Sequence, residues 1–183
     1  SSREKIEKYV NEDECLWISL NNTTGQCVVG GYKKSIEALK EKLTQDGIQS
    51  TVLKTSHAFH TPMMDGAAKE FKEFLNSIEM REPKYPIISN LTGEYATEHL
   101  MDQPSYWADQ ITNPVEFERV LDNALDYEET VFYELGGKTL SSLAKKHTLL
   151  KEGQVFVPCI RHPREKKSDI VQLLGVIRSE EHT

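Results

Sequence analysis

The chain has 183 residues, of which 38% are hydrophobic and 28% are charged, which is ordinary for a globular protein of one domain or two small ones. The formal net charge of −7 argues against binding to nucleic acid, which requires a basic face. No apolar run approaches the roughly 18 residues of a membrane-spanning helix, and no signal-peptide pattern opens the chain. We therefore expect a protein that binds neither nucleic acid nor membrane.

The first 56 residues are predicted to form helix, strand, strand, helix and strand, in that order. Apolar residues that recur at i, i+3 and i+4 indicate the helices, and short apolar runs bounded by turn residues indicate the strands. This order is that of a ferredoxin-like βαββαβ unit without its first strand. Because such a sheet has an open edge, we expect residues before Ser1 to complete it. The predicted elements are a helix at 2–10, a strand at 15–20, a turn at 21–25, a strand at 26–30, a helix at 33–45 and a strand at 48–55.

Beyond residue 56, helices alternate with strands, which predicts a parallel sheet with helices on its faces. The run at 85–89 has an apolar centre, as expected for a strand that is covered on both sides. The fold class predicted for the whole chain is therefore mixed α/β, with a small α+β part followed by a parallel-sheet part. The predicted elements of the second part are helices at 63–78, 105–112, 114–127, 139–147 and 168–177, strands at 85–89, 130–135 and 154–159, and a polar tail at 179–183.

Three cysteines, Cys15, Cys27 and Cys159, are scattered along the chain and form no C-x-x-C pair. Neither a zinc site nor a disulfide framework is therefore expected, and a reducing cytoplasm is the compartment that best suits the chain. Cys15 and Cys27 lie in apolar runs and are predicted to be small core residues. A cysteine nucleophile is the weaker alternative, because a buried thiol is usually inert. No H-E-x-x-H or other zinc spacing occurs, and we predict no metal site.

Two histidines, His57 and His60, lie where the two parts of the chain meet. Pro62 sits where the next helix would begin, because its ring fixes φ and its missing N–H costs nothing in a first turn. His60 is thus expected at a strand-to-helix junction, where it could titrate near neutral pH and act as a general base. The alternative, which is commoner for such residues, is that both are ordinary turn histidines.

A general base needs a nucleophile and an orienting group, and the sequence contains no Gly-x-Ser-x-Gly motif. Gly136, Gly137 and Lys138 resemble a phosphate-binding turn. However, the complete patterns G-x-x-x-x-G-K-[ST] and G-x-G-x-x-G are both absent. The residues alone therefore leave the partner of the histidine open.

Six segments carry recognisable patterns: 22–31 (NTTGQCVVGG), 56–64 (SHAFHTPMM), 85–93 (YPIISNLTG), 106–117 (YWADQITNPVEF), 132–137 (FYELGG) and 156–161 (FVPCIR). Together they resemble the malonyl-CoA:acyl carrier protein transacylase family, and in particular the acyltransferase domains of modular type I polyketide synthases. The second segment is similar to the family pattern SHAFHSPLM, and the first to NxPxQxVVSG, in which Ser usually stands where this chain has Gly30. Any one of these matches is weak evidence, but six matches in the family's order, which cover nearly the whole chain, are strong evidence.

The resemblance implies an acyltransferase that moves a malonyl group from coenzyme A to a serine in the motif GHSxG. The group would then pass to the phosphopantetheine thiol of an acyl carrier protein. His60 matches the histidine that acts as general base in this family. Gln110 matches the position whose backbone carbonyl holds the other ring nitrogen, although polyketide members often have His there.

The resemblance also assigns residues to substrate selection. His57, Ala58 and Phe59, followed by His60, match a tetrad that accompanies preference for malonyl over methylmalonyl groups. A Phe in the third place can fill the volume that an α-methyl group would need. Asn22 matches a residue near the acyl pocket, which is a weaker assignment.

By this resemblance, residues 1–56 form most of a ferredoxin-like subdomain and residues 57–160 the C-terminal part of an α/β-hydrolase-like subdomain. Residues 161–183 then form a post-domain linker and a terminal helix. The GHSxG serine, the arginine for the malonyl carboxylate and one oxyanion donor are expected before Ser1, so this chain alone is expected to be inactive.

The partners that the resemblance implies are an acyl carrier protein, other domains of a polyketide synthase and the N-terminal half of the same domain. Malonyl-CoA is the expected substrate and carrier-bound phosphopantetheine the acceptor, with no tightly bound cofactor. The alternative from another class is a non-catalytic module of the same fold that docks carrier proteins.

Overall fold

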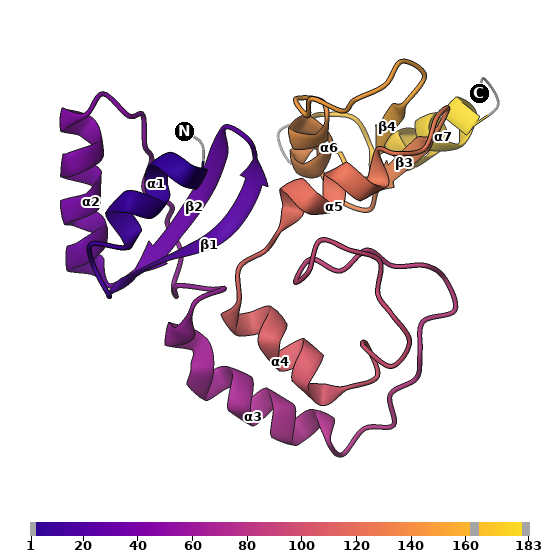
Figure 1. Ribbon diagram of the computed structural model, residues 1–183. Coiled ribbons are helices and arrows are strands. Elements are labelled where there is room, and N and C mark those ends of the chain that lie inside the picture. Colours follow the sequence, from indigo (N-terminus) through magenta and orange to yellow (C-terminus); the bar gives the residue numbers. More distant parts are fainter. Residues whose placement is uncertain (1–2, 162–164, 181–183) are drawn as a thin grey trace. The chain divides into compact units, whose positions relative to one another are not determined.

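The structure, a computed structural model, describes residues 3–161 and 165–180 and contains helices and short strands of mixed α/β class (Figure 1). The chain separates into two compact units, Ser1–Asn123 and Ala124–Thr183. This division does not coincide with the subdomain boundaries expected at residues 56 and 160, which stay predictions. In the described part of the chain, no helix is long and apolar enough to cross a membrane.

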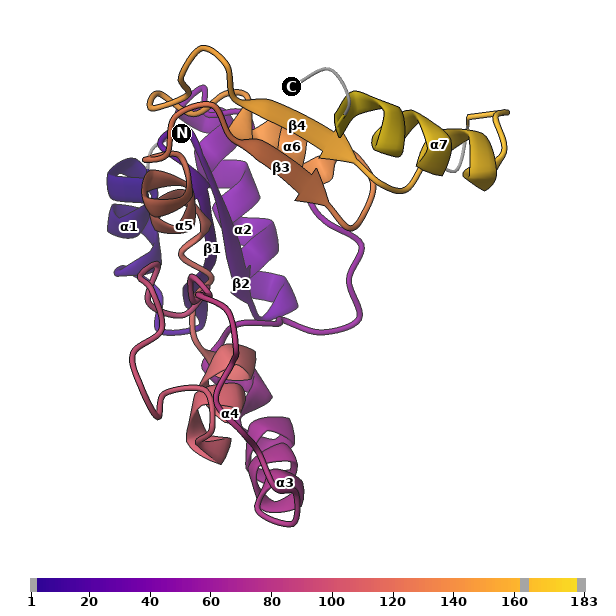
Figure 2. The same ribbon diagram turned by 90° about the vertical axis from the view of Figure 1, so that its right-hand side faces the viewer.

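The first unit begins with an antiparallel hairpin of β1 (Leu16–Thr23) and β2 (Gln26–Gly31), against which α1 (Arg3–Val10) and α2 (Lys33–Gln45) pack (Figures 1 and 2). All four elements lie where the sequence predicts them. The apolar stripes of both helices face the hairpin, as amphipathic spacing requires. The buried core that results consists of Ile6, Tyr9, Leu16, Leu39 and Leu43.

Two predictions for the first 56 residues are wrong. The turn predicted at 21–25 is shorter, because Asn21 and Asn22 continue β1. The strand predicted at 48–55 does not form: no strand in residues 3–161 or 165–180 pairs with it. Val52 and Leu53 are 52% and 58% exposed. A strand persists only where a neighbour satisfies its backbone hydrogen bonds, and this segment has none.

A helical pair follows in the same unit. The short 3₁₀ helix η1 (Pro62–Met64) leads into α3 (Asp65–Leu75), which lies alongside α4 (Pro104–Thr112) in both views (Figures 1 and 2). Helix α3 is shorter than the helix predicted at 63–78, and α4 matches the helix predicted at 105–112 but begins one residue earlier. The helix predicted at 114–127 is also shorter and corresponds to α5 (Phe117–Ala124).

The segment between α3 and α4 turns where a strand was expected at 85–89. Only an isolated antiparallel bridge joins Ile88 and Tyr95, so the strand prediction is wrong. The chain instead closes a turn in which the Gly93 N–H donates to the Ser89 carbonyl at 2.7 Å. Gly93 has φ +75°, and a Cβ there would lie 2.3 Å from Cβ of Arg119, so only glycine fits. An apolar run becomes a strand only beside a partner, and the described residues place none there.

The second unit is built around a parallel pair, β3 (Val131–Glu134) and β4 (Val155–Pro158), as the predicted alternation of strands and helices requires. Phe132 and Phe156 are partners in the register, and their rings stack with centroids 4.7 Å apart. This stacking adds to the apolar contact between the strands.

Helices α6 (Thr139–Ala144) and α7 (Asp169–Glu180) complete the second unit. Helix α6 ends earlier than predicted, and α7 continues to Glu180, beyond the predicted start of the polar tail. The linker expected at 161–183 is described only in part, because residues 162–164 and 181–183 lie outside the described residues.

Candidate active site

His60 lies just before η1, as the sequence predicts, but the strand expected on its other side does not form, so the predicted strand-to-helix junction is only half present. Its backbone has φ 60°, a left-handed conformation that costs a non-glycine residue about 1–3 kcal/mol. Two hydrogen bonds to the end of α4 hold it there. The His60 N–H donates to the Ile111 carbonyl at 3.0 Å, and the ring Nδ1 lies 2.8 Å from the Gln110 carbonyl oxygen.

The residues just beyond α4 leave the Gln110 carbonyl available. The last carbonyls of a helix lack partners within the helix. The N–H that would reach back to Gln110 belongs to residue 114, which is Pro114 and has none. The N–H of Val115, which would reach back to Ile111, donates instead to the Ser19 carbonyl of β1 at 2.9 Å.

This contact fixes the state of the imidazole. A backbone carbonyl can only accept a hydrogen bond, so Nδ1 of His60 carries the hydrogen that it donates to Gln110. In the neutral ring, Nε2 then carries the free lone pair. The geometry therefore leaves Nε2 able to take a proton, while the carbonyl orients the ring as the third member of a catalytic triad does.

A buried chain of hydrogen bonds supports Gln110 from behind. Its side-chain Nε2 donates to the Tyr106 hydroxyl at 2.8 Å, and that hydroxyl lies 2.9 Å from Oγ of Ser89. Tyr106 and Ser89 are 5% and 1% exposed. Ser89 Oγ also accepts from the N–H of Leu91 at 3.1 Å, which ties the chain of bonds to the turn that Gly93 closes. Neither Tyr106 nor Ser89 was predicted from the sequence, although Tyr106 and Gln110 stand at the i, i+4 spacing of one helix face.

The other side of His60 is fixed by Thr61, which is fully buried. Its hydroxyl donates to the Ala58 carbonyl at 2.6 Å and accepts from the Met63 N–H at 3.3 Å. Its methyl group faces β2: a Cβ built on Gly30 would lie 2.7 Å from Cγ2 of Thr61. The hairpin therefore approaches the histidine segment so closely that position 30 has no room for a side chain beside this methyl.

The predicted selectivity residues lie at the surface next to His60. Phe59 is 47% exposed, and its ring centroid lies 5.9 Å from that of His57, which is also exposed. Nδ1 of His57 lies 3.0 Å from Oγ of Ser56. Ala58 is half-buried and supplies the carbonyl that Thr61 binds. The two rings are thus free to contact a substrate, and their role in selection stays a prediction.

A pocket of about 270 Å³ lies beside α4, on the side of the helix where Tyr106 and Gln110 project. Its walls are mostly apolar and include Ile87, Ile88, Met101 and Trp107.

The profile of the family described as "Acyl transferase domain" matches residues 2–175. The chain belongs to the acyl transferase domain family. It is 35% identical over 153 residues to a subunit of the phenolphthiocerol/phthiocerol polyketide synthase of Mycobacterium tuberculosis (strain CDC 1551 / Oshkosh), a match that covers 83% of this chain and 10% of that protein. It is 30% identical over 146 residues to the malonyl CoA-acyl carrier protein transacylase of Bacillus subtilis (strain 168), covering 79% and 46% of the two proteins.

Solved structures agree with this family. The acyltransferase domain of SpnD, in complex with 2-(pent-4-yn-1-yl)malonyl, superposes with a TM-score of 0.86 at 25% identity, over 94% of this chain and 42% of that chain. A malonyl CoA-acyl carrier protein transacylase from Clostridium perfringens shares the fold with a TM-score of 0.80 at 22% identity, over 99% and 56%. These matches confirm the predicted fold class, and the chain spans less than two thirds of the length of each of these relatives.

Asn22, the remaining predicted site residue, has no described hydrogen bond to the histidine site. It lies half-buried on β1, and no hydrogen bond in residues 3–161 joins it to His60 or Gln110. Its neighbour Asn21 is the buried one, with Nδ2 3.4 Å from a carboxylate oxygen of Glu116 and with Oδ1 unpartnered among the described residues. A role for Asn22 near the acyl group stays a prediction.

The three cysteines of the chain are all free and at least partly buried. Cys27 packs against the core of the first unit, and burial raises the pKa of its thiol. A raised pKa reduces the fraction of nucleophilic thiolate. This argues against the cysteine-nucleophile alternative at Cys27.

Proposed function

We propose that this acyltransferase chain carries the general base of a Ser-His malonyl transferase, which moves malonyl groups from coenzyme A to an acyl carrier protein. The observation that carries the proposal is the 2.8 Å contact between Nδ1 of His60 and the Gln110 carbonyl, which leaves Nε2 free to exchange protons. The Bacillus relative is a malonyl CoA-acyl carrier protein transacylase, which supports the choice of substrate and acceptor.

In the first half-reaction, Nε2 of His60 takes the proton of a serine hydroxyl as the serine oxygen attacks the thioester carbonyl of malonyl-CoA. The carbon–sulfur bond then breaks, and coenzyme A leaves as a thiol after taking that proton from His60. In the second half-reaction, Nε2 takes the thiol proton of phosphopantetheine as its sulfur attacks the malonyl–serine ester. The proton returns to the serine oxygen as the ester bond breaks.

The nucleophilic serine of this proposal lies outside these residues, because the 183-residue sequence contains no Gly-His-Ser-x-Gly segment. This chain alone would then bind or transfer no acyl group through serine. Its partners would be the segment that carries the serine, an acyl carrier protein and the other domains of a polyketide synthase. The three free cysteines suit the reducing cytoplasm in which we place it.

The proposed base is tested in the full-length protein that carries this chain together with the serine. We choose His60→Asn, because asparagine tolerates φ > 0 and its amide can still donate toward Gln110, but it has no titratable nitrogen. Transfer of malonyl from malonyl-CoA to the carrier protein is expected to fall about 10²- to 10⁴-fold, the usual contribution of a general base. Mass spectrometry of the carrier protein measures the transfer.

Urea unfolding of His60→Asn shows whether the variant is still folded. Glu79→Gln, an exposed substitution in the loop after α3, is the control variant and should leave the rate of malonyl transfer unchanged. Near-normal transfer by His60→Asn would remove the histidine from the chemistry. That result, or the absence of a Gly-His-Ser-x-Gly segment in the full-length protein, would favour a non-catalytic module that docks carrier proteins.

We further propose that His57, Ala58 and Phe59 favour malonyl over methylmalonyl groups. The half-exposed ring of Phe59 could occupy the volume of an α-methyl group. Excluding one methyl group contributes about 1–3 kcal/mol, or roughly 10- to 200-fold. The double variant His57→Tyr with Phe59→Ser should therefore raise the rate with methylmalonyl-CoA relative to malonyl-CoA, and an unchanged ratio would exclude these residues from selection.

A further inference from the structure

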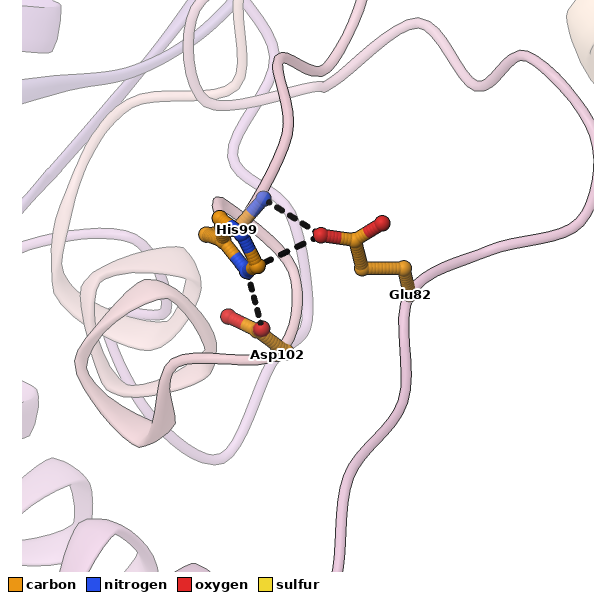
Figure 3. Close-up of side chains that lie close together, drawn as sticks. All are labelled: Glu82, His99 and Asp102. Carbon is orange, nitrogen blue, oxygen red and sulfur yellow. Dashed lines mark hydrogen bonds and ion pairs between the residues drawn. The ribbon is translucent and has the colours of Figure 1, made fainter.

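A second cluster of polar side chains lies where the loop after α3 meets the turn before α4 (Figure 3). Nδ1 of His99 is 2.9 Å from Oε1 of Glu82 and 2.9 Å from Oδ2 of Asp102. These three atoms all lie within 4.8 Å of one another. None of the three residues belongs to the site built around His60.

The local structure holds each of the three groups in place. His99 has φ 58°, and its backbone N–H donates to Oε1 of Glu82 at 3.1 Å. Nε2 of Gln103 donates to Oδ1 of Asp102 at 2.7 Å, which leaves Oδ2 to face the imidazole. The side chains of His99 and Glu82 are 74% and 45% exposed, so solvent ions reach the cluster.

The chemistry of the cluster suits a positive charge at its centre. Two carboxylates converge on one imidazole nitrogen. A divalent cation that replaces the hydrogen on Nδ1 would be coordinated by the lone pair of this nitrogen and by the two carboxylates.

The donor set distinguishes between metals. Zn²⁺ binds imidazole nitrogen and carboxylate oxygen at about 2.0–2.2 Å, with three protein ligands and a water in an open tetrahedral site. Neighbouring ligand atoms are then about 3.3 Å apart, so the present separations need to open by only a few tenths of an ångström. Ca²⁺ and Mg²⁺ require six or more oxygen ligands, which three side chains with one nitrogen do not provide.

We propose that Glu82, His99 and Asp102 bind a zinc ion that fastens the loop between α3 and α4. Water completes the coordination. The ion links Glu82 to a turn that leads directly into α4, the helix whose other end carries the Gln110 carbonyl. No metal was predicted from the sequence, because the spacing of the three ligands matches no zinc motif.

The full chain is titrated with Zn²⁺ in competition with a chromophoric chelator. The wild type is expected to bind one equivalent that Asp102→Asn weakens at least about 100-fold, because loss of even an outer-shell partner typically costs 10- to 100-fold. His99→Asn, which keeps a residue that tolerates φ > 0, should weaken it similarly. Glu79→Gln removes a carboxylate of the same loop that pairs with Arg81 and should leave the affinity unchanged.

NMR of isotope-labelled histidines gives a second readout that does not depend on any activity. Zinc should shift the His99 Nδ1 resonance in the wild type and not in Asp102→Asn. Mg²⁺ at the same concentration should shift it in neither. Zinc binding that is as tight in Asp102→Asn and His99→Asn as in the wild type would place the ion elsewhere and overturn the proposal. Absence of binding at millimolar zinc would also overturn the proposal. The three side chains would then form only a hydrogen-bonded cluster.

Discussion

Two histidines in the first unit share a backbone conformation and differ in the groups that face their rings. His60 has φ 60° and His99 φ 58°. Nδ1 of His60 meets a neutral backbone carbonyl, whereas Nδ1 of His99 meets two carboxylates. A neutral acceptor fixes the tautomer and orientation of the ring without adding a charge, which suits a base that must gain and lose protons. Two anions favour a cation at the nitrogen, which suits a structural clasp or a metal ligand.

The difference has a cause in the sequence. Pro114 removes the N–H that would satisfy the Gln110 carbonyl, so the end of α4 offers a strong neutral acceptor to His60. At His99 the acceptors are side chains, brought in by a loop residue, Glu82, and by the next turn, Asp102. The acceptor for His60 is a backbone group, whereas the acceptors for His99 are side chains. A side-chain substitution can therefore remove the acceptors of His99 but not the acceptor of His60.

The largest stability effect is expected at Tyr106, which hydrogen-bonds to the side chain of Gln110, the residue whose carbonyl accepts from His60. Tyr106→Phe removes the hydroxyl that pairs with Nε2 of Gln110 and Oγ of Ser89. Nε2 of Gln110 then loses its hydrogen-bond partner, whereas Oγ of Ser89 keeps the N–H groups of Leu91 and Thr92. Leaving one such group without a partner costs about 1–3 kcal/mol, so the free energy of unfolding should fall by about that amount. Urea unfolding measures this change.

A control variant and an activity readout show whether Tyr106 positions Gln110. Tyr85→Phe changes a ring that is 80% exposed and should leave stability unchanged. In the full-length protein, Tyr106→Phe should lower kcat for malonyl transfer more than it raises KM. A loss of stability with unchanged kcat would mean that Tyr106 holds the fold but not the base.

The close approach of Gly30 to Thr61 gives the next effect. Gly30→Ala places a Cβ 2.7 Å from Cγ2 of Thr61 and should destabilise the protein by about 1–3 kcal/mol, as overpacking does. Thr61→Ser removes that methyl but keeps the hydroxyl that binds Ala58. In the Thr61→Ser background the cost of Gly30→Ala should nearly disappear.

Chemical unfolding of the four proteins of this double-mutant cycle measures the coupling. Gly66→Ala is the matched control, because a Cβ at this position in α3 meets nothing within 4 Å, and it should stabilise the helix. Equal costs of Gly30→Ala in both backgrounds would contradict a specific contact between the hairpin and the histidine segment.

A smaller effect is expected at Glu134 in the second unit, where neutral donors surround an anion. Partial burial alone would raise the pKa of Glu134, but hydrogen bonds from the Ser141 hydroxyl and from the N–H groups of Ser141 and Leu140 lower it below the usual 4.5. A depressed carboxyl pKa adds stability above the unfolded pKa, and that stability is lost as the pH falls through the folded pKa.

Glu134→Gln should therefore cost about 1 kcal/mol near neutral pH, the usual value of a helix N-cap, and cost progressively less in acid. Thermal unfolding across the acid range measures the difference. A cost that does not change with pH would show that the charge of Glu134 is not what stabilises α6. This carboxylate also explains why the turn at Gly136 and Gly137 is not free for a phosphate: the chain's own anion already occupies the N-terminus of α6.

The smallest stability effect is expected at the exposed His99. In metal-free protein, Asp102→Asn should lower the pKa of His99 toward its ordinary 6.5, because the hydrogen bond that His99 donates to Asp102 is the largest cause of its raised pKa. A raised histidine pKa adds stability below the unfolded pKa, and that stability is lost as the pH rises through the folded pKa. NMR titration of His99 measures the shift. Glu79→Gln should leave the pKa of His99 unchanged. If Asp102→Asn also leaves it unchanged, the two carboxylates are not what distinguishes His99 from His60.

The sequence predicts those parts of the fold whose cause is local. The bounds predicted for α2, 33–45, match the structure at both ends, because amphipathic spacing starts the helix and Gly47, at φ +69°, lies just beyond it. The strands predicted at 48–55 and 85–89 fail, because a strand depends on a neighbour that its own residues do not specify. The strands predicted at 130–135 and 154–159 do form, because each is the other's hydrogen-bonding partner in a parallel pair.

The candidate site divides in the same way. His60 was identified from its place before Pro62, and Gln110 only through resemblance to a family, although Pro114 marks its free carbonyl in the sequence. The contacts of Tyr106 with Ser89 and of His99 with Glu82 each join residues 17 apart, through turns that no periodicity reveals. Such contacts depend on how the loop between α3 and α4 folds, so they were missed.

The tautomer of His60 tests the central claim most directly. NMR of the isotope-labelled histidines distinguishes a ring nitrogen that carries hydrogen from one that does not. The contact with the Gln110 carbonyl predicts a neutral ring with hydrogen on Nδ1 and a free Nε2. A neutral His60 with its hydrogen on Nε2 would contradict the account, because the nitrogen assigned to proton transfer would have no lone pair to accept the proton.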